Sequence, residues 1–219
     1  MGSLKQKIPA TAPQAIASFN FTDIAEGTGI VVLNGFQQET SAATTYALSQ
    51  QSPNSVTIET EWAETGETFT KQVDLDFDLG EFNLPQDIKG TALFNINVWS
   101  KADGGGDTIT SYIHFRLRKW DGSAETEIAN ARSADFAETD NTGVNHTVNV
   151  PLTVTNTHFK KGEQLRITVE GYSKIGAAAQ SGVVAIGHDP GDRDGTRIKP
   201  STDPATTKFI NHIPFRINV

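Results

Sequence analysis

Apolar and polar residues alternate at every second position through most of the chain between residues 55 and 219. Because successive side chains of a strand point to opposite faces, this period predicts strands with one buried and one solvent-facing side. Turn residues separate the alternating runs, and no run has the period of a long helix. We therefore predict an all-β protein, an antiparallel β-sandwich of roughly ten strands in which a jelly-roll arrangement is favoured.

Three of the alternating runs are regular enough to predict which side chains form the core. The nine residues expected there are Phe94, Ile96, Val98, Ile113, Phe115, Leu117, Leu165, Ile167 and Val169.

Other local signals refine the expected strands. Val56 is in phase with Trp62, so both are expected on one buried face. Asn34 and Gly35 form the dipeptide typical of a hairpin turn. Pro151 interrupts an otherwise regular strand, and a proline there predicts a sheet edge or a bulge because it has no N–H to donate.

Two regions are expected along the chain. Residues 1–14 contain Pro9 and Pro13 and too few apolar residues to fold alone, so they are predicted to form an extended N-terminal arm. Residues 15–219 are predicted to form the sandwich domain. The first ten residues are not followed by an apolar segment, so no secretion signal is expected.

The arm supplies the candidate partner-binding residues, which are Lys5, Lys7 and Ile8. The two lysines are expected to meet an acidic surface of another subunit. The arm is therefore predicted to bind a neighbouring protein or a second copy of this chain.

Composition narrows the expected partners. The formal net charge of −8 and the pI of about 5.1 argue against a general nucleic-acid-binding surface, which requires a basic footprint. The chain has no cysteine, so disulfides and thiolate sites are excluded. No apolar run approaches the ~20 residues that cross a bilayer. Neither nucleic acid nor membrane is an expected partner.

The densest polar cluster runs from His188 to Gly195 and includes Asp189, Asp192 and Asp194. Three carboxylates on one loop could bind calcium, which prefers six to eight oxygen ligands. The spacing fails the EF-hand pattern, and a solvated structural turn is the favoured interpretation, with calcium as the alternative. No metal ligand is assigned.

A second acidic row consists of Asp74, Asp76 and Asp78, which share one face of a predicted strand. The simplest interpretation is the solvent-facing side of an antiparallel strand. The alternative is a surface for a cation or a basic partner, which would relieve the repulsion between like charges.

No catalytic residue is assigned. The sequence contains no nucleophile elbow and no metal-binding histidine spacing, and each histidine is expected on the surface or in a loop. These are His114, His146, His158, His188 and His212. Trp99 and Trp120 are candidates for exposure, which would suit a glycan-binding or interface role.

Three segments together resemble a known group of proteins. They are residues 19–29 (FNFTDIAEGTG), residues 159–169 (FKKGEQLRITV) continuing to 187–191 (GHDPG), and residues 213–218 (IPFRIN). They resemble jelly-roll virion structural proteins of tailed bacteriophages and related viruses, of the decoration or minor capsid type.

The resemblance implies a non-enzymatic capsid component without cofactors. Its expected partners are the major capsid protein, other virion proteins and further copies of the chain in a homo-oligomer. It would be located in the virion and assembled in the host cytoplasm.

The sequence leaves two further hypotheses open. One is a carbohydrate-binding or receptor-binding β-sandwich module, which an exposed aromatic platform would favour. The other is a glycoside-active enzyme, which a cleft with two facing carboxylates would favour.

Overall fold

The computed structural model describes residues 17–18, 28–39, 43–139, 141–200 and 204–216. Within these ranges the secondary structure consists of β-strands, and no α-helix is present. None of the described segments is a helix with the length and apolarity that crossing a membrane requires. The N-terminal arm, with Lys5, Lys7 and Ile8, lies outside the described residues.

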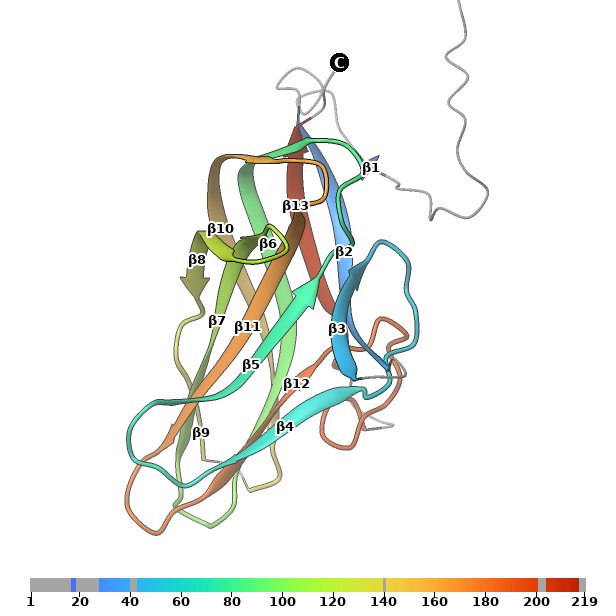
Figure 1. Cartoon of the computed structure of the whole chain (residues 1–219). Coiled ribbons are helices and arrows are strands. Elements are labelled where there is room, and N and C mark those ends of the chain that lie inside the picture. Colours follow the sequence, from blue (N-terminus) through green and yellow to red (C-terminus); the bar gives the residue numbers. More distant parts are fainter. Residues whose placement is uncertain (1–16, 19–27, 40–42, 140, 201–203, 217–219) are drawn as a thin grey trace, which may run out of the picture.

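The described residues form thirteen strands, which Figure 1 labels. In chain order they are β1 (Ala17–Ser18), β2 (Thr28–Glu39), β3 (Thr44–Ser49), β4 (Glu59–Glu64), β5 (Thr70–Asp78), β6 (Gln86–Ala102), β7 (Ile109–Trp120), β8 (Glu125–Arg132), β9 (Phe136–Glu138), β10 (Val144–Phe159), β11 (Gln164–Ile175), β12 (Gly182–Gly187) and β13 (Phe209–Arg216).

The strands form one hydrogen-bonded sheet in the order β4-β12-β6-β13-β2-β3-β5-β11-β7-β8. β1 pairs with β2, β10 with β6 and β9 with β7. All pairings are antiparallel except the short β3–β5 contact, in which Tyr46 lies opposite Phe77. The prediction of an antiparallel all-β fold is therefore confirmed, and the jelly-roll arrangement stays a prediction.

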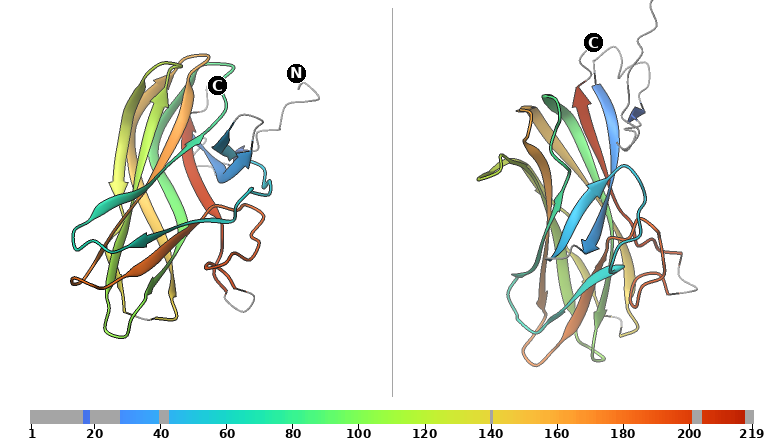
Figure 2. Two further views of the ribbon diagram at one scale, coloured as in Figure 1. Left: turned by 60° about the horizontal axis from the view of Figure 1, so that its bottom comes forward. Right: turned by 45° about the vertical axis from the view of Figure 1, so that its right-hand side comes forward.

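The sheet folds over into two layers, which enclose the core. We call β5, β11, β7 and β8 the front layer and β10, β6, β13 and β2 the rear layer, following the view of Figure 1. Figure 2 shows the molecule from two further directions, with the loop that follows β12 lying against one side of its lower half.

The core lies between the two layers, where the predicted alternation places it. All nine residues expected in the core have side chains with no solvent exposure. Phe115 stacks on Phe94 with ring centroids 5.1 Å apart and reaches Phe209 at 6.0 Å. Phe209 in turn packs against Phe77 at 5.0 Å. An aromatic cluster thus joins both layers and β13.

Two local predictions are wrong. Val56 is 49% exposed, because it precedes β4 and lies outside its alternation, whereas Trp62 within β4 is buried as expected. The Asn34-Gly35 dipeptide is not a turn but the middle of β2. A Cβ on Gly35 would lie 2.3 Å from Cδ1 of Phe209, so the glycine is needed for the close approach of an aromatic ring.

We expect Gly35→Ala to lower the free energy of unfolding by about 1–3 kcal/mol, the usual range for overpacking a well-filled core. The added methyl group would also lie 3.0 Å from Cδ1 of Phe77, so two rings must move. Urea denaturation of the two proteins measures this difference. Gly105→Ala is the matched control, because nothing lies within 4 Å of a Cβ at that position. Equal stabilities of the Gly35 and Gly105 variants would contradict the proposed contact.

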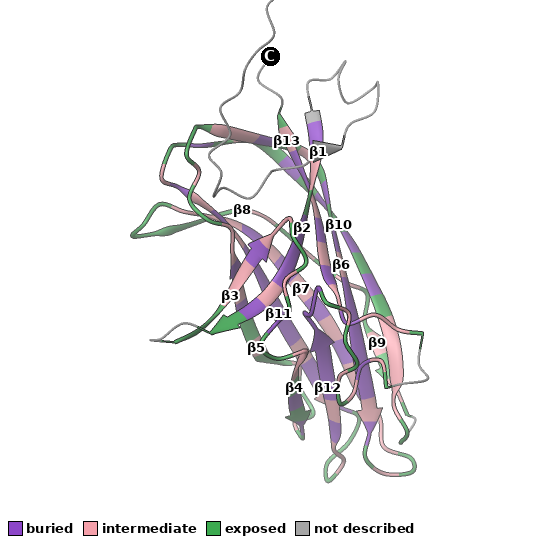
Figure 3. Ribbon diagram, turned by 90° about the vertical axis from the view of Figure 1, so that its right-hand side faces the viewer, coloured by how far each residue is buried: buried purple, intermediate pink, exposed green. Residues whose placement is uncertain are grey.

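Pro151 lies on an edge strand, as predicted. Among the described strands β10 pairs only with β6, and Pro151 lies opposite Leu93 in that ladder. The exposed and buried residues alternate along β10 (Figure 3), which marks one side as core and the other as surface. A register shift also separates Val154 from Thr157, so the strand carries an irregularity as well as an edge.

Candidate functional site

The outer surface of the front layer is a lattice of opposite charges. Arg166 of β11 donates through Nε and Nη2 to the two carboxylate oxygens of Asp78, at 2.6 and 2.7 Å, and also contacts Glu125. It reaches Asp76 at 3.4 Å, and Arg118 lies 3.9 Å from the same carboxylate. The acidic row of β5 is therefore solvent-facing as expected, and its countercharges come from neighbouring strands of the same chain.

A buried carboxylate, Glu170 of β11, lies at the centre of this lattice. Only 2% of the residue is exposed. It contacts His114 Nδ1 at 3.0 Å, Arg116 Nε at 3.1 Å and Lys71 Nζ at 3.3 Å. Burial by itself would raise the pKa of Glu170, but the hydrogen bonds from Arg116, His114 and Lys71 hold that pKa below its usual value. The lattice saturates this carboxylate, which leaves it little capacity to bind an external ligand.

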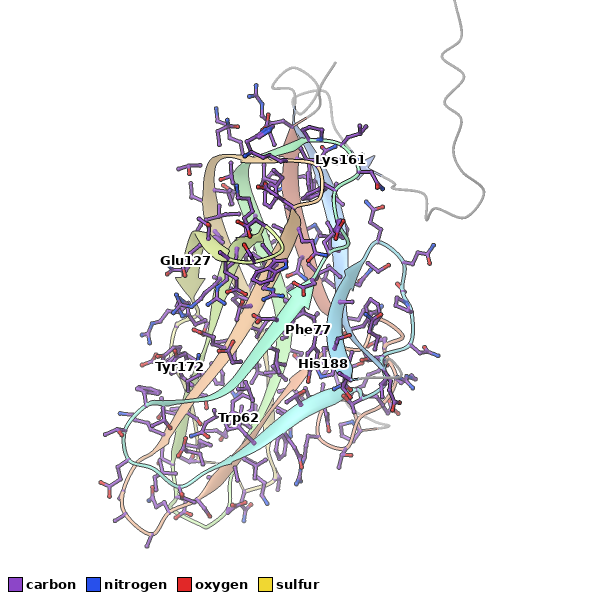
Figure 4. The ribbon with its side chains drawn as sticks, viewed as in Figure 1. Trp62, Phe77, Glu127, Lys161, Tyr172 and His188 are labelled. Atoms are coloured by element: carbon purple, nitrogen blue, oxygen red, sulfur yellow. The ribbon has the colours of Figure 1, made fainter. Side chains whose placement is uncertain are left out.

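Aromatic rings extend the front surface beside Glu170. Tyr172 stacks on Tyr112 with ring centroids 4.8 Å apart, and the guanidinium of Arg132 lies 4.2 Å from the Tyr112 centroid. Figure 4 shows Tyr172 and Glu127 on this side of the molecule. The rings are covered by cations and by one another, so they are packed into the charged lattice rather than spread as a flat platform.

The outer surface of the rear layer has the opposite character. None of its central residues is an aspartate, glutamate, lysine or arginine, and two of them are exposed apolar side chains, Leu93 at 36% and Val32 at 37%. We call this surface the uncharged face. It consists of Val32, Thr91, Leu93, Asn95, Thr147, Asn149, Pro151, Thr153, Ile210 and His212.

One row of this face crosses all four strands. Pro151 lies opposite Leu93, Leu93 opposite His212, and His212 opposite Val32. In the next row the side chains of Asn95 and Asn149 hydrogen-bond to one another. The face is thus apolar at its centre, with amide and hydroxyl groups beside it.

A second cluster surrounds His188, which is fully buried at the end of β12, beside Phe77 (Figure 4). Ser55 Oγ lies 3.3 Å from its Nδ1, and Thr60 Oγ1 lies 2.9 Å from its Nε2. Desolvation lowers the pKa of His188 to about 4, so the imidazole is neutral at pH 7. His188 lies in a loop, as expected, but it is buried rather than exposed, because the segment that contains Ser55 packs over it.

The loop that follows His188 is packed rather than solvated. The Asp189 carboxylate is fully buried and accepts hydrogen bonds from the Ser55 N–H at 2.9 Å and from Arg193 Nε at 2.8 Å. Asp192 accepts from the Thr206 hydroxyl and pairs with Lys199 at 3.0 Å. These bonds explain why the pKa of each of these two carboxyls is lowered despite burial, which opposes the shift. Protein donors therefore occupy oxygens that a calcium site would need.

A cavity of about 320 Å³ opens between the chain that joins β8 to β9 and the free edge of β10. It is lined by residues 133–136 and 146–149. His146 stacks on Phe136 at 4.8 Å, and burial lowers the pKa of its imidazole. Its Nε2 lies 3.1 Å from Ser100 Oγ and 4.0 Å from Glu138 Oε2. We call this feature the edge cavity.

The structure thus brings together two serine–histidine pairs that the sequence did not indicate. In a catalytic triad the acid binds the imidazole nitrogen opposite the serine. Asp189 instead binds the loop backbone and Arg193, and Glu138 approaches the same nitrogen as Ser100. Ser55 and Ser100 are 3% and 1% exposed. In this arrangement the Ser55 and Ser100 hydroxyls hydrogen-bond neighbouring segments of the chain and are too buried to reach a substrate.

The tryptophans do not form an exposed platform. Trp62 is buried in the main core, and its Nε1 donates to Ser173 Oγ at 2.9 Å. Trp99 is only 6% exposed, because it packs in a second small core with Ala185 and Ile198. Trp120 is covered by the Arg166 guanidinium, 5.2 Å from its ring centroid. Trp99, a candidate for exposure, is therefore buried, since Ile198 of the loop after β12 packs against it.

No family model matches this chain, and no curated protein matches it in sequence. Solved structures do match the fold. An α-amino acid ester hydrolase matches with a TM-score of 0.50 and 11% identity, over 84% of this chain and 36% of the hydrolase chain. An aminopeptidase from a marine sediment Thaumarchaeota archaeon matches with a TM-score of 0.49 and 8% identity, over 86% of this chain and 37% of that chain.

Capsid chains of infectious bursal disease virus also match, with TM-scores of 0.28 to 0.31. One of them, in the T13 particle, has 9% identity over the whole of this chain and 43% of its own. At these identities the first hydrolase likeness establishes the fold, and the matches below 0.5 add no argument. This chain spans little more than a third of the first hydrolases it matches.

These comparisons correct the predicted class of protein. The prediction of a non-enzymatic virion structural protein is wrong, because the solved chain that matches this fold with a TM-score of 0.50 is an α-amino acid ester hydrolase. The physical reason is that alternating strands specify a sandwich, and the same sandwich serves in unrelated proteins. The expected capsid partners, the homo-oligomer and the virion location stay predictions.

Proposed function

We propose that this chain is the β-sandwich component of a hydrolase of ester or amide bonds, and that its uncharged face packs against the part of the enzyme that holds the substrate. Two observations support the proposal. The fold matches about a third of an ester hydrolase chain, so a sandwich of this kind occurs as one part of such an enzyme. The uncharged face is the surface through which the sandwich would pack against the substrate-binding part of the enzyme.

The uncharged face is the observation that carries the proposal. A chain with net charge −8 places both signs of charge in a dense lattice on its front surface, and none at the centre of the rear surface. The centres of protein interfaces are depleted in charged residues and enriched in apolar ones, with polar groups around them. The row from Pro151 through Leu93 and His212 to Val32 has this composition.

Leu93→Glu tests the proposal by placing a charge at the centre of the uncharged face. The tagged chain is purified under native conditions from the cells that produce it, and the eluate is assayed with amino acid p-nitrophenyl esters and p-nitroanilides. We expect hydrolysis to co-elute with the unaltered chain and to fall at least about tenfold with Leu93→Glu, the effect of ~1.4 kcal/mol lost at an interface.

Thr68→Glu is the matched control, since this exposed residue precedes β5 of the front layer and is not part of the uncharged face of the rear layer. It adds the same charge and should leave the co-eluting activity unchanged. Melting temperatures of both variants verify that they are folded. Absence of ester or amide hydrolysis from the eluate of the unaltered chain would refute the proposed function.

A further inference from the structure

Two short segments of the chain form opposite walls of the edge cavity. Four consecutive residues of β10, His146 to Asn149, line it on one side, and four consecutive residues, Ser133 to Phe136, line it on the other. Residues 133–135 belong to no strand, so the chain leaves the β7 ladder after β8 and returns to it at β9. The cavity is therefore a slot between a strand edge and an irregular segment.

Pro151 reveals which backbone groups of β10 face away from β6. In an antiparallel pair, residues alternate between those that bond to the partner strand and those whose N–H and C=O point outward. A proline has no N–H, so in this ladder it occupies an outward position opposite Leu93. The register from Val144 to Val154 is unbroken, so every second residue shares that orientation.

Thr147 and Asn149 are the outward residues that line the edge cavity. Their backbone N–H and C=O groups point into the slot, and no described strand pairs with this edge of β10. The alternate residues His146 and Val148 point to the opposite face. The His146 ring stacks on Phe136, and Val148 is buried, with 6% exposure. The slot thus combines unpaired backbone groups with an apolar floor.

The charges around the slot are acidic. Asp135 lines it with a side chain that is 44% exposed, and Glu138 lies 4.0 Å from the His146 imidazole. Arg132 pairs with Asp135 at 3.0 Å but is itself half exposed and on the surface. Burial lowers the pKa of His146, so this imidazole adds no positive charge at pH 7. A ligand with basic groups complements this surface.

We propose that the edge cavity binds an extended peptide segment of a partner protein by strand addition to β10. The peptide backbone pairs with Thr147 and Asn149, one of its apolar side chains enters between Phe136 and Val148, and a basic residue lies near Asp135. Pro151 supplies no donor and ends the pairing on one side, so the recognised segment is short. Strand addition takes affinity from backbone hydrogen bonds and specificity from alternate side-chain pockets. Thr147 and Asn149 also lie at the border of the uncharged face, but the peptide would bind through their backbone groups at the free edge of β10. The proposal does not depend on the proposed hydrolase function.

The test uses the full chain and a fluorescein-labelled hexapeptide, Lys-Leu-Thr-Leu-Thr-Lys, with a C-terminal amide. Fluorescence anisotropy is expected to give a Kd below about 1 mM, the weak range in which a few backbone bonds and one apolar side chain suffice. Two further peptides are N-methylated, one at both leucines and the other at both threonines. Because alternate N–H groups of a strand face opposite ways, one methylated peptide should lose binding and the other should retain it.

Asn149→Pro removes one outward N–H, just as the native Pro151 does, and is expected to raise the Kd about tenfold or more through the lost bond and the bulk of the ring. Thr153→Pro makes the same change outside the cavity and should leave the Kd unaltered. Melting temperatures show whether each proline variant folds. If a variant is unfolded, binding of the methylated peptides to the native chain still tests the proposal. The proposal is overturned if no anisotropy change occurs at 2 mM protein, if both methylated peptides bind like the parent, or if the two proline variants bind equally.

Discussion

Replacing Phe115 by alanine is expected to lower the free energy of unfolding by about 3–5 kcal/mol, the range for truncating a fully buried phenylalanine. Phe115 has no solvent exposure, and its ring stacks on Phe94 and reaches Phe209. The substitution would open a cavity where the front layer, the rear layer and β13 meet. Urea denaturation measures the loss, and the melting temperature should fall by roughly 6–20 °C for a chain of this size.

Leu84→Ala is the control for this experiment, since Leu84 is 69% exposed and surface changes of this kind are usually within about 0.5 kcal/mol. A Phe115 variant that unfolds at nearly the same urea concentration as the Leu84 variant would mean that the two layers do not pack as described.

The second large effect is a pH dependence of stability that originates at His188. Its pKa is lowered from 6.5 to about 4 in the folded protein by burial. Between those values the unfolded chain takes up a proton that the folded chain does not, so stability falls as the pH decreases from about 6.5 to about 4. Below pH 4 both states are protonated and this contribution no longer changes. The total is on the order of 3 kcal/mol, at 1.36 kcal/mol for each pH unit.

The measurement is the free energy of unfolding of the native chain and of His188→Gln at several pH values between 7 and 4.5. The glutamine amide can still bond to Ser55 or Thr60 but does not titrate, so the slope in this range should decrease by the His188 contribution. The remaining slope includes that of His146, whose pKa burial also lowers. His158→Gln is the matched control, because the His158 side chain is 56% exposed and its removal leaves the buried imidazole in place. An unchanged slope in His188→Gln would assign the pH dependence to other groups.

The core could be predicted residue by residue because alternation is a local property of a strand. All nine predicted residues are buried for this reason, and Pro151 indicated an edge by the same kind of local argument. The prediction of a turn at Asn34-Gly35 failed because it relied on a local turn preference, whereas a contact with a distant residue explains the glycine in this strand. Gly35 is required by the ring of Phe209, which joins β2 only when β13 pairs with it.

On the front surface, too, local alternation predicted which residues are exposed, whereas distant contacts determine their partners. Its alternation predicted that the aspartates of β5 face solvent, but it could not identify their partners. Arg166 reaches Asp78 across 88 positions of the chain, and Glu170 meets His114 across 56. Only the register of β11 with β5 and with β7 places these groups together.

Local patterns in the sequence were enough to predict an all-β sandwich, its core residues and the edge at β10, because strand period and proline chemistry act within a few residues. The tertiary structure alone decided which side chains meet: Ser55 with His188 across 133 positions, the residues of the edge cavity, and the row that forms the uncharged face. These depend on strand order and register, which arise from the packing of the whole sheet. A pattern in one strand contains no information about which distant strand will lie beside it.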